Sequence, residues 1–522
     1  MEKNMAKFIS ADEAAKLVND NDTLAIGGFG SHCGPDGLME ALGARFRETG
    51  SPTNLTSLTG VSNGAFSNDA VGMNRIAYEG LLGTVIAGHL GNAPKLSDLA
   101  ANNLAAVYTL PLGVVMNLYR AIASKQPGVL TKVGLRTFVD PRIEGCRINE
   151  KAIAQNREVV KLMVLEGEDY LFYPSFPINI CFIRGTYADE DGNISMEHDA
   201  LTGAELQIAI ATHSSGGIVI VQVEKVLKVG TISAKNVRIH NSIVDYVVVV
   251  DRALSTECYA TKEYLPEISG EALCPTQDLE PMEHSLRKVI ARRAAMELEQ
   301  GEVINLGIGL PSGVGSVANE EGMKCLLSLE SGPLGGVPLE GLAFGASQNP
   351  EAIQSICDTF DLYDGGFLNK TFLGAGQIDQ YGNVNVSKFG SKCTGPGGFI
   401  NISQNTQKVF FLSSFSVGKS HIEFSDKGLH IVQDGALGKF VKNVSQITFS
   451  ADYARKVGQE VYYITERAVF KLVDGGIMLV EVAPGIDLQK DILDKMAFRP
   501  LISKSLKEMD TRLFKKEKMG II

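Results

Sequence analysis

Several signatures of common protein classes are missing from this sequence. The eight cysteines form no C-x-x-C pair and the eight histidines show no metal-ligand spacing, so a structural zinc site is not expected. The sequence also lacks a Walker P-loop and an H-E-x-x-H helix. Nucleotide hydrolysis and zinc-protease chemistry are therefore without support.

The chain also lacks an excess of basic residues and any long apolar run. Its net charge of −11 argues against a nucleic-acid partner, because neutralising phosphates requires a basic face. The apolar runs are far shorter than the roughly 20 residues that span a bilayer, so no membrane partner is expected. With scattered cysteines and no signal peptide, the sequence predicts a cytoplasmic protein. The basic tail, residues 504–518, is predicted to be a solvated helix.

Glycine is abundant, with 55 glycines among 522 residues, many of them at the ends of apolar runs. Short strands that alternate with helical patterns of about 10 to 15 residues indicate parallel α/β sheets. The length exceeds what one hydrophobic core usually supports. We therefore expect two related open α/β domains with mainly parallel sheets and flanking helices.

The second half of the chain repeats the plan of the first. A predicted helix at 11–18 and a strand at 23–26 lead into a glycine turn in the first half. A predicted helix at 285–298 and a strand at 302–306 lead into another glycine turn in the second half. The same order of helix, strand and turn indicates an internal duplication.

A further landmark supports the duplication. A D-x-x-G-N turn begins at Asp189 in the first half and at Asp379 in the second, and an apolar strand follows each. The stretch 258–283 is rich in Pro, Glu and Gly and has little periodicity, so it is predicted to be the linker. The expected domains are therefore 1–257 and 284–522.

One carboxylate, Glu330, stands where the apolar segment 325–327 gives way to a glycine-rich turn. A charged group at the end of a buried strand is unfavourable unless it is hydrogen-bonded or used in chemistry. An exposed Glu at such a turn would need no explanation. On local grounds alone, Glu330 is therefore a modest indication of a catalytic carboxylate.

Other local patterns are weaker. The Gly307–Gly309 turn could present N–H groups to a phosphate at a helix N-terminus, but a bare G-x-G favours a packing role. The run 394–399 is typical of an oxyanion nest, with a plain hinge as an equal alternative. Side chains of neighbouring residues on an extended chain point apart, so His32 and Cys33 are predicted to be pocket wall rather than a nucleophile and its base.

Longer motifs resemble one family. They occupy residues 127–134, 138–142, 184–189, 330–332, 382–387, 397–401 and 483–487. In this order they resemble the class I coenzyme A transferases, particularly the single-chain acetate/propionate CoA-transferases, through nearly the whole chain. The resemblance implies two related α/β domains with the active site at their junction, and a homo-oligomer, either a dimer or a tetramer.

The resemblance also assigns roles. Glu330 would be the nucleophile of a ping-pong transfer of CoA from a short-chain acyl-CoA to a carboxylic acid, such as acetate or propionate, through a glutamyl-CoA thioester. The backbone N–H groups of Gly397 and Gly398 would bind the oxyanions. The CoA-site residues would be Gly307, Ile308, Gly309, Leu310 and Pro311, and the acyl-pocket candidates are Phe29, His32, Leu112 and Gly113. Coenzyme A esters are the expected substrates, with no tightly bound cofactor and no metal.

Three single residues and the segment 31–34 depart from the family pattern. Leu112 stands at a usual Gln, and Arg136 and Cys146 stand at usual glycines. Losing an amide contact costs roughly 0.5–1.5 kcal/mol, so the acyl specificity stays open. Two other functions also stay open: an acyl-CoA hydrolase that uses the same Glu330, with water exclusion altered by Leu112 or Arg136, and a catalytically silent acyl-CoA or sugar-phosphate sensor.

Overall fold

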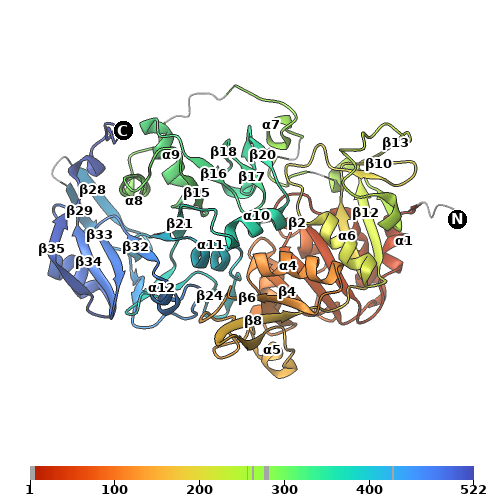
Figure 1. Cartoon of the computed structure of the whole chain (residues 1–522), viewed down its shortest axis with the longest axis horizontal. Coiled ribbons are helices and arrows are strands. Elements are labelled where there is room, and N and C mark those ends of the chain that lie inside the picture. The colour runs from red at the N-terminus through yellow and green to blue at the C-terminus, as the bar shows by residue number, and fades with distance from the viewer. Residues whose placement is uncertain are drawn as a thin grey trace. The chain divides into compact units, whose positions relative to one another are not determined.

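The computed structural model describes residues 6–66, 68–255, 257–261, 264–275, 281–425 and 428–521. The chain divides into two compact units. Unit 1 contains residues 1–274, 329–361 and 388–401, and unit 2 contains residues 275–328, 362–387 and 402–522. Both units combine large, mainly parallel sheets with flanking helices (Figure 1), which confirms the expected α/β fold class.

The sheet of unit 1 is parallel throughout, in the order β1-β14-β12-β9-β2-β3-β4-β5. Its strands are β1 (Lys7–Phe8), β14 (Tyr246–Val249), β12 (Ile218–Val223), β9 (Ile180–Arg184), β2 (Thr23–Phe29), β3 (Leu55–Val61), β4 (Leu82–His89) and β5 (Ala106–Thr109). Helices α4 (Leu112–Ala123) and α6 (Glu205–Ser214) pack on these strands (Figure 1). Most side chains of the central strands are buried, as expected for a parallel sheet covered on its faces.

Local sequence explains where the first helix of unit 1 begins. Helix α1 (Ala11–Lys16) starts after Ser10, whose hydroxyl accepts the Glu13 N–H at 3.2 Å. The Glu13 carboxylate in turn accepts the Ser10 N–H at 2.9 Å. This reciprocal capping satisfies backbone groups that the first helical turn leaves without partners.

In unit 2 the strands follow the order β16-β15-β21-β26-β32-β33-β34-β35. They are β16 (Leu326–Ser328), β15 (Val303–Leu306), β21 (Lys370–Gly374), β26 (Lys408–Leu412), β32 (Glu460–Ile464), β33 (Ala468–Val473), β34 (Gly476–Val482) and β35 (Leu501–Glu508). The pairs from β16 to β32 are parallel, and β33 is antiparallel to both of its neighbours. Helices α8 (Leu286–Ala295) and α9 (Ser312–Glu321) flank this sheet.

The structure confirms the repeated plan. The order β3-β2-β9-β12-β14 in unit 1 matches β16-β15-β21-β26-β32 in unit 2. The two D-x-x-G-N turns also share their hydrogen bonds. Asp189 accepts the backbone and side-chain N–H groups of Asn193, both at 2.9 Å. Asp379 accepts the same two groups of Asn383, both at 3.0 Å.

The compact units cut across the expected domain boundaries. Segments 329–361 and 388–401, expected in the second domain, belong to unit 1. The start of the expected linker is packed into unit 1 as well, because Cys258 forms a β-bridge with His32. Residues 262–263 and 276–280 of that linker lie outside the described residues. The boundaries 1–257 and 284–522 therefore remain a proposal about the repeat.

The prediction of a helix in the basic tail is wrong. Residues 501–508 form strand β35, which pairs with β34, and a short 3₁₀ turn follows at Thr511–Phe514. Pairing with the edge of a sheet satisfies the backbone there and overrides local helix propensity. No helix within the described ranges combines the length and apolar character needed to cross a membrane.

Candidate active site

A tight turn carries Glu330 beyond the end of β16. The Gly332 N–H donates to the Leu329 carbonyl at 3.1 Å, and the Leu329 N–H donates to the Pro333 carbonyl at 3.0 Å. Gly332 has φ +133°, and a Cβ there would lie 2.2 Å from the Gln354 carbonyl oxygen. Only glycine fits this position, so the turn that follows Glu330 is fixed by its sequence.

The structure brings Glu330 together with Gly398. A Cβ built on Gly398 would lie 2.0 Å from Glu330 Oε2 and 2.9 Å from its Cδ. The carboxyl group therefore lies directly against the α-carbon of Gly398. Among the described residues, no acceptor is recorded for the Gly398 N–H. This arrangement suits the oxyanion role expected for Gly398, which stays a prediction.

The expected role of Gly397 needs correction. Its N–H donates to the Gly88 carbonyl at 2.9 Å, so this donor is already engaged inside the fold. Its carbonyl accepts the Leu112 N–H, also at 2.9 Å. Gly397 has φ +52°, the left-handed conformation that glycine adopts readily. Gly397 thus holds the glycine segment in place and does not offer a free oxyanion donor in this structure.

Dehydration sets the electrostatics of Glu330. Burial raises the pKa of its carboxyl to about 7. Within the described part of the chain, no hydrogen bond or ion pair to the carboxyl is recorded that would offset this effect. Removing water disfavours the charged form of a carboxyl. Glu330 therefore changes its charge near neutral pH, and its ionised form is poorly solvated.

Two acyl-pocket candidates, Phe29 and His32, lie beside the segment that follows the Glu330 turn. A Cβ on Gly345 would lie 2.9 Å from the Phe29 ring and 3.6 Å from His32 Cδ2. His32 Nε2 is 3.1 Å from the Ala343 carbonyl oxygen. The Ser331 hydroxyl donates to the Gly345 carbonyl, which ties this segment to the residue after Glu330. Both candidates are buried, and their contact with an acyl group remains a prediction.

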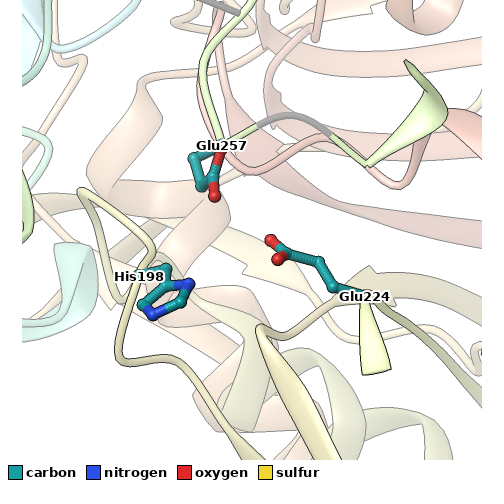
Figure 2. A group of neighbouring side chains, drawn as sticks. All are labelled: His198, Glu224 and Glu257. Carbon is teal, nitrogen blue, oxygen red and sulfur yellow. The ribbon is translucent and has the colours of Figure 1, made fainter. Parts of the chain in front are cut away.

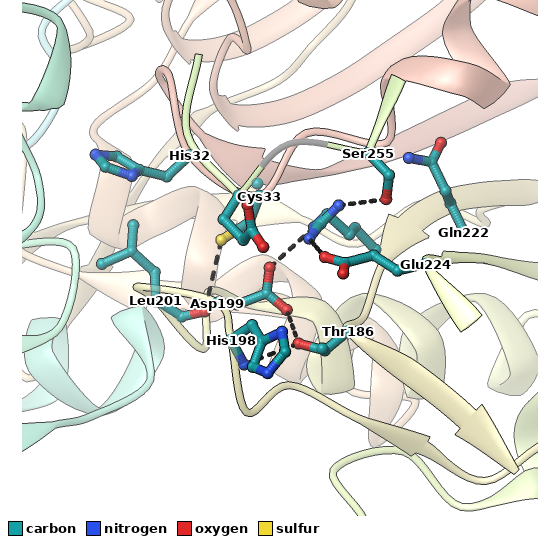
Figure 3. A network of polar contacts seen from close by, with 12 residues as sticks. His32, Cys33, Thr186, His198, Asp199, Leu201, Gln222, Glu224 and Ser255 are labelled. Atoms are coloured by element: carbon teal, nitrogen blue, oxygen red, sulfur yellow. Dashed lines mark hydrogen bonds and ion pairs between the residues drawn. The ribbon is translucent and has the colours of Figure 1, made fainter. Parts of the chain in front are cut away.

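The side chains of His32 and Cys33 do not contact each other, as expected for neighbours on an extended chain. The Cys33 thiol points to the Leu201 carbonyl oxygen, at 3.6 Å, and away from the His32 ring (Figure 3). The thiol that His32 affects is that of Cys258. Burial raises the pKa of the Cys258 thiol, but the charge of His32 and a hydrogen bond to it lower that pKa to about 7 overall. No sequence motif indicated this pairing, because the two residues are far apart in the chain.

The other two acyl-pocket candidates anchor the glycine segment. Leu112 is fully buried, and Cβ atoms on Gly60 and Gly88 would lie 3.0 and 3.2 Å from its Cδ1. The Gly113 N–H donates to Asn401 Oδ1 at 3.1 Å. The Leu112 side chain is therefore part of the core. Leu112 stands where the family pattern has Gln, so this buried position lacks a polar side chain. Its burial gives no direct reason to assign it a contact with the acyl group.

The expected CoA-binding segment lies in unit 2 between β15 and α9. It forms the predicted strand-turn-helix, with Ile308 55% exposed and open space around the α-carbon of Gly309. The Ser312 hydroxyl donates to the Gly309 carbonyl at 2.8 Å. An exposed glycine turn at a helix N-terminus suits an anionic group. Contact of Gly307, Ile308, Gly309, Leu310 and Pro311 with CoA stays a prediction.

A possible metal-binding group lies elsewhere in unit 1. The side chains of His198, Glu224 and Glu257 point toward one another, with ligand atoms within 4.8 Å (Figure 2). Arg252, however, donates to both Glu257 oxygens at 2.7 and 2.8 Å and lies 3.2 Å from Glu224. Arg184 donates to Glu224 at 2.6 Å. Guanidinium groups thus already neutralise both carboxylates, and the cluster suits an ion-pair network better than a metal ion.

The centre of that network is the buried guanidinium of Arg184. It donates to Asp199 at 2.9 Å and to the Ser255 hydroxyl at 2.6 Å. Asp199 also accepts the Thr186 hydroxyl at 2.8 Å. A buried charge is tolerated when it is paired and hydrogen-bonded in this way. The network connects residues 184, 186, 199, 224, 252, 255 and 257 of unit 1, and we assign it a structural role.

The parts assembled around Glu330 define a class of protein. An α/β fold that holds a dehydrated carboxyl beside a glycine, whose N–H has no acceptor assigned among the described residues, has components that suit an enzyme working by covalent catalysis. Sequence reasoning found Glu330 and Gly398, gave no role to Asn401 although it lies in the motif 397–401, and missed Phe360; both of these side chains lie against Gly113. A single Phe on a helix looks like any core residue, so no local signal could have identified it.

Comparisons with known proteins specify the family. A family model for coenzyme A transferase matches residues 8–250. Caffeate CoA-transferase from Acetobacterium woodii is 45% identical over 526 residues, which cover 99% of each chain. Acetate CoA-transferase YdiF from Escherichia coli O157:H7 is 40% identical over 517 residues, covering 98% of this chain and 96% of the relative.

Solved structures agree with these relatives. The crystal structure of the acyl-CoA transferase YdiF apoenzyme from Escherichia coli O157:H7 matches with a TM-score of 0.92 and 39% identity, covering 99% of this chain and 98% of that chain. A thioester complex of the same protein with CoA matches equally well, with a TM-score of 0.92. The chain therefore belongs to the class I coenzyme A transferases, in their single-chain form. It is a CoA-transferase.

Proposed function

We propose that this enzyme transfers CoA from a short-chain acyl-CoA to a carboxylic acid by a ping-pong reaction through a glutamyl-CoA thioester on Glu330. The observation that supports the proposal is the dehydrated Glu330 carboxyl, which lies against the Gly398 backbone with its pKa raised to about 7. A carboxylate freed from its water shell is a stronger nucleophile than one in water. It is also half ionised near neutral pH.

The first half-reaction conserves the activation of the thioester. A Glu330 carboxylate oxygen attacks the acyl carbonyl carbon, the new C–O bond forms, and the C–S bond breaks to release CoA thiolate. The product is a mixed anhydride between Glu330 and the acyl group. The thiolate then attacks the glutamyl carbonyl, which forms a C–S bond and releases the first acid as its carboxylate. Glu330 now carries CoA as a thioester.

The second half-reaction reverses these steps with a second acid. Its carboxylate attacks the glutamyl thioester and forms an anhydride, with release of CoA thiolate. The thiolate attacks the acyl carbonyl of the new acid, and Glu330 leaves as a carboxylate. No ATP is needed, because each intermediate keeps the activation of the original thioester. The remote CoA tail can contribute binding energy to the reacting carbonyl.

Each attack passes through a tetrahedral oxyanion. The α-carbon of Gly398 lies against the Glu330 carboxyl, and its N–H has no acceptor assigned among the described residues. Loss of one such donor typically lowers kcat by about 10²–10³-fold, or about 2.7–4 kcal/mol. The Gly397 N–H does not share this role while it donates to Gly88. We therefore assign the oxyanion contact of this segment to Gly398 alone.

A transfer assay tests the proposal. The enzyme is mixed with acetyl-CoA or propionyl-CoA and a panel of C2 to C6 acids, and new acyl-CoA esters are measured without ATP. Acetate is one of these acids, and the longer caffeate is added to them, because relatives at 40% and 45% identity carry those names. We expect CoA to appear on at least one acid with wild-type enzyme and on none with Glu330→Gln.

Two other outcomes identify the alternative functions. CoA release that does not depend on the acceptor acid would indicate an acyl-CoA hydrolase that uses the same site. Saturable binding of acyl-CoA with neither transfer nor release would indicate a sensor. Transfer by Glu330→Gln at the wild-type rate would contradict the proposal.

The same proposal includes association of copies into a dimer or a tetramer, which the family resemblance implies. Sedimentation velocity at several protein concentrations measures this directly. A single species at the mass of one 56.1 kDa chain would contradict it.

A further inference from the structure

One aromatic ring lies beside the Glu330 carboxyl. The Phe360 Cζ atom lies 3.1 Å from the position that a Cβ on Gly398 would take, and Glu330 Oε2 lies 2.0 Å from that position. The ring edge and the carboxyl therefore meet on the same face of Gly398. A Cβ on Gly113 would lie 2.7 Å from Phe360 Cδ1. The ring thus fits against two glycines that leave room for it.

The helix that carries Phe360 is firmly held. Helix α10 (Ile356–Asp364) presents Asp358 and Asp361, and both pair with the Arg120 guanidinium of α4. The Ser355 hydroxyl donates to Asp358 at 2.6 Å. Ion pairs on both sides of Phe360 in the sequence connect this part of α10 to α4. The ring, which is 0% exposed, is therefore fixed in its place beside Glu330.

A ring in this position has a chemical consequence. It offers no hydrogen bond to the carboxyl and occupies space that water could otherwise fill. Water is the competing nucleophile in this reaction. Its oxygen would attack the glutamyl-CoA carbonyl, a C–O bond would form, the C–S bond would break, and CoA would leave as the thiol while Glu330 returns as a carboxylate. Such hydrolysis dissipates the thioester that a transferase must conserve.

We propose that Phe360 is a positioning residue that excludes water from the Glu330 carboxyl and so directs its activated intermediates to acids rather than to hydrolysis. The inference rests on the proposed function, since it presumes a glutamyl-CoA intermediate. It goes beyond that function by naming a residue that separates transfer from hydrolysis. Phe360 acts through its contact with the Glu330 environment and forms no bond with the substrate.

The test uses Phe360→Leu, with Phe182→Leu as the matched control. Phe182 is an equally buried ring on β9 of the same unit, so its loss reports the general effect of removing a core ring. Two quantities are measured: the ratio of CoA thiol release without acceptor to CoA transfer with acceptor, and the pH midpoint of kcat/KM for acyl-CoA. For Phe360→Leu we expect the ratio to rise by at least about tenfold, equivalent to about 1.4 kcal/mol. We also expect the pH midpoint to move to lower pH.

The outcomes separate this inference from the proposed function. A wild-type ratio and a wild-type midpoint in Phe360→Leu overturn the inference, even when the wild-type enzyme forms its glutamyl-CoA adduct. Absence of that adduct in the wild-type enzyme instead removes the proposed function. An equal rise of the ratio in Phe182→Leu also overturns the inference, because the effect would then be a general one.

If Phe360→Leu does not fold, a second variant tests whether the ring lies beside the Glu330 carboxyl. Phe360→Tyr keeps the ring and adds a hydroxyl at Cζ, the ring atom nearest to Gly398. A hydrogen bond to the ionised carboxyl favours the charged form. We therefore expect Phe360→Tyr to lower the pH midpoint of kcat/KM. An unchanged midpoint would contradict the contact between this ring and the Glu330 carboxyl.

Discussion

Two buried carboxyl groups of unit 1, Glu330 and Glu205, share a raised pKa but differ in nearly every other respect. Burial raises the pKa of Glu330 to about 7 and that of Glu205 to about 8. Glu205 is 0% exposed and accepts the Gly28 N–H at 2.7 Å. Glu330 is half-buried on a turn whose other residues are buried, and no hydrogen bond to its carboxyl is found among the described residues.

The glycines around each carboxyl explain the difference. A Cβ on Gly203 would lie 1.9 Å from Glu205 Oε2, and one on Gly27 would lie 2.8 Å from its Oε1. Backbone thus packs closely around Glu205, which is fully buried. The Glu330 carboxyl meets one glycine at its side, and the residue as a whole is half-buried where Glu205 is fully buried. Dehydration alone therefore does not make a nucleophile; the carboxyl must also be within reach of a thioester.

Removing each carboxyl should give the largest contrast. Glu330→Gln should lower kcat for CoA transfer by about 10⁴-fold or more, since loss of a nucleophile removes the covalent route. Glu205→Gln should stay within about tenfold of wild type, because its amide oxygen can still accept the Gly28 N–H. Initial rates of acyl-CoA formation measure both. Equal losses in the two variants would break the distinction between a nucleophile and a structural acid.

Filling the space beside Glu330 should have a smaller effect. A methyl group at Gly398 would overlap Glu330 Oε2, so Gly398→Ala must displace the carboxyl. A displacement of about 1 Å typically costs about 10²-fold in rate. Gly374→Ala is the control, since no atom lies within 4 Å of the position its Cβ would take. A full rate for Gly398→Ala would show that the carboxyl does not react from this position.

The pH dependence of activity should follow Glu330 and not Glu205. The ionised carboxylate is the nucleophile, so kcat/KM for acyl-CoA should fall about tenfold per pH unit below a midpoint near 7 and level off above it. An acyl-CoA whose own groups do not titrate between pH 5 and 9 is required. A midpoint near the ordinary glutamate value of 4.5 would show that Glu330 is well hydrated.

The free energy of unfolding should fall as pH rises, whereas activity should increase. A carboxyl whose folded-state pKa is raised binds its proton more tightly in the folded protein. Its favourable contribution is fully present below pH 4.5 and is lost as pH rises through about 7 for Glu330 and about 8 for Glu205. Glu330→Gln should therefore raise the free energy of unfolding at pH 9 by about 1–3 kcal/mol, and leave it nearly unchanged at pH 4.

Urea denaturation of wild type, Glu330→Gln and Glu205→Gln at pH 4 and pH 9 measures this effect. Glu205→Gln should show a gain of the same sign, reduced to the extent that the amide distorts the contact with Gly28. A loss of stability at pH 9 in Glu330→Gln would mean that the ionised carboxyl has a stabilising partner, contrary to the structure.

Much of the fold could be predicted from the sequence, because its signals are local. Strand-turn-helix units follow from glycines at the ends of apolar runs, and the repeated Asp189 and Asp379 turns form identical hydrogen bonds. The prediction of a helical tail was wrong because β35 pairs with β34, and local sequence does not report such a tertiary interaction. Cys258, in the expected linker, forms a β-bridge with His32. The sequence did not predict this contact, because the two residues are far apart in the chain.

The site was predictable to the extent that a motif marks it. Glu330 and Gly398 lie in two family motifs, and the structure brings these two residues together. The donor role of Gly397 could not be judged from sequence, because its N–H bonds to Gly88 on a distant strand. Phe360 escaped notice for the same reason. Its contact with the Glu330 environment depends on how α10 packs, and no short motif reports that.

The most direct measurement is mass spectrometry of the enzyme after exposure to acyl-CoA without an acceptor acid, followed by an acid quench and proteolysis. We expect the Glu330 peptide to gain the mass of CoA less one water, and the Glu330→Gln enzyme to show no such gain. Steady transfer between two acids with no CoA on that peptide, or with CoA on the Glu205 peptide instead, would contradict the assignment of Glu330 as the nucleophile.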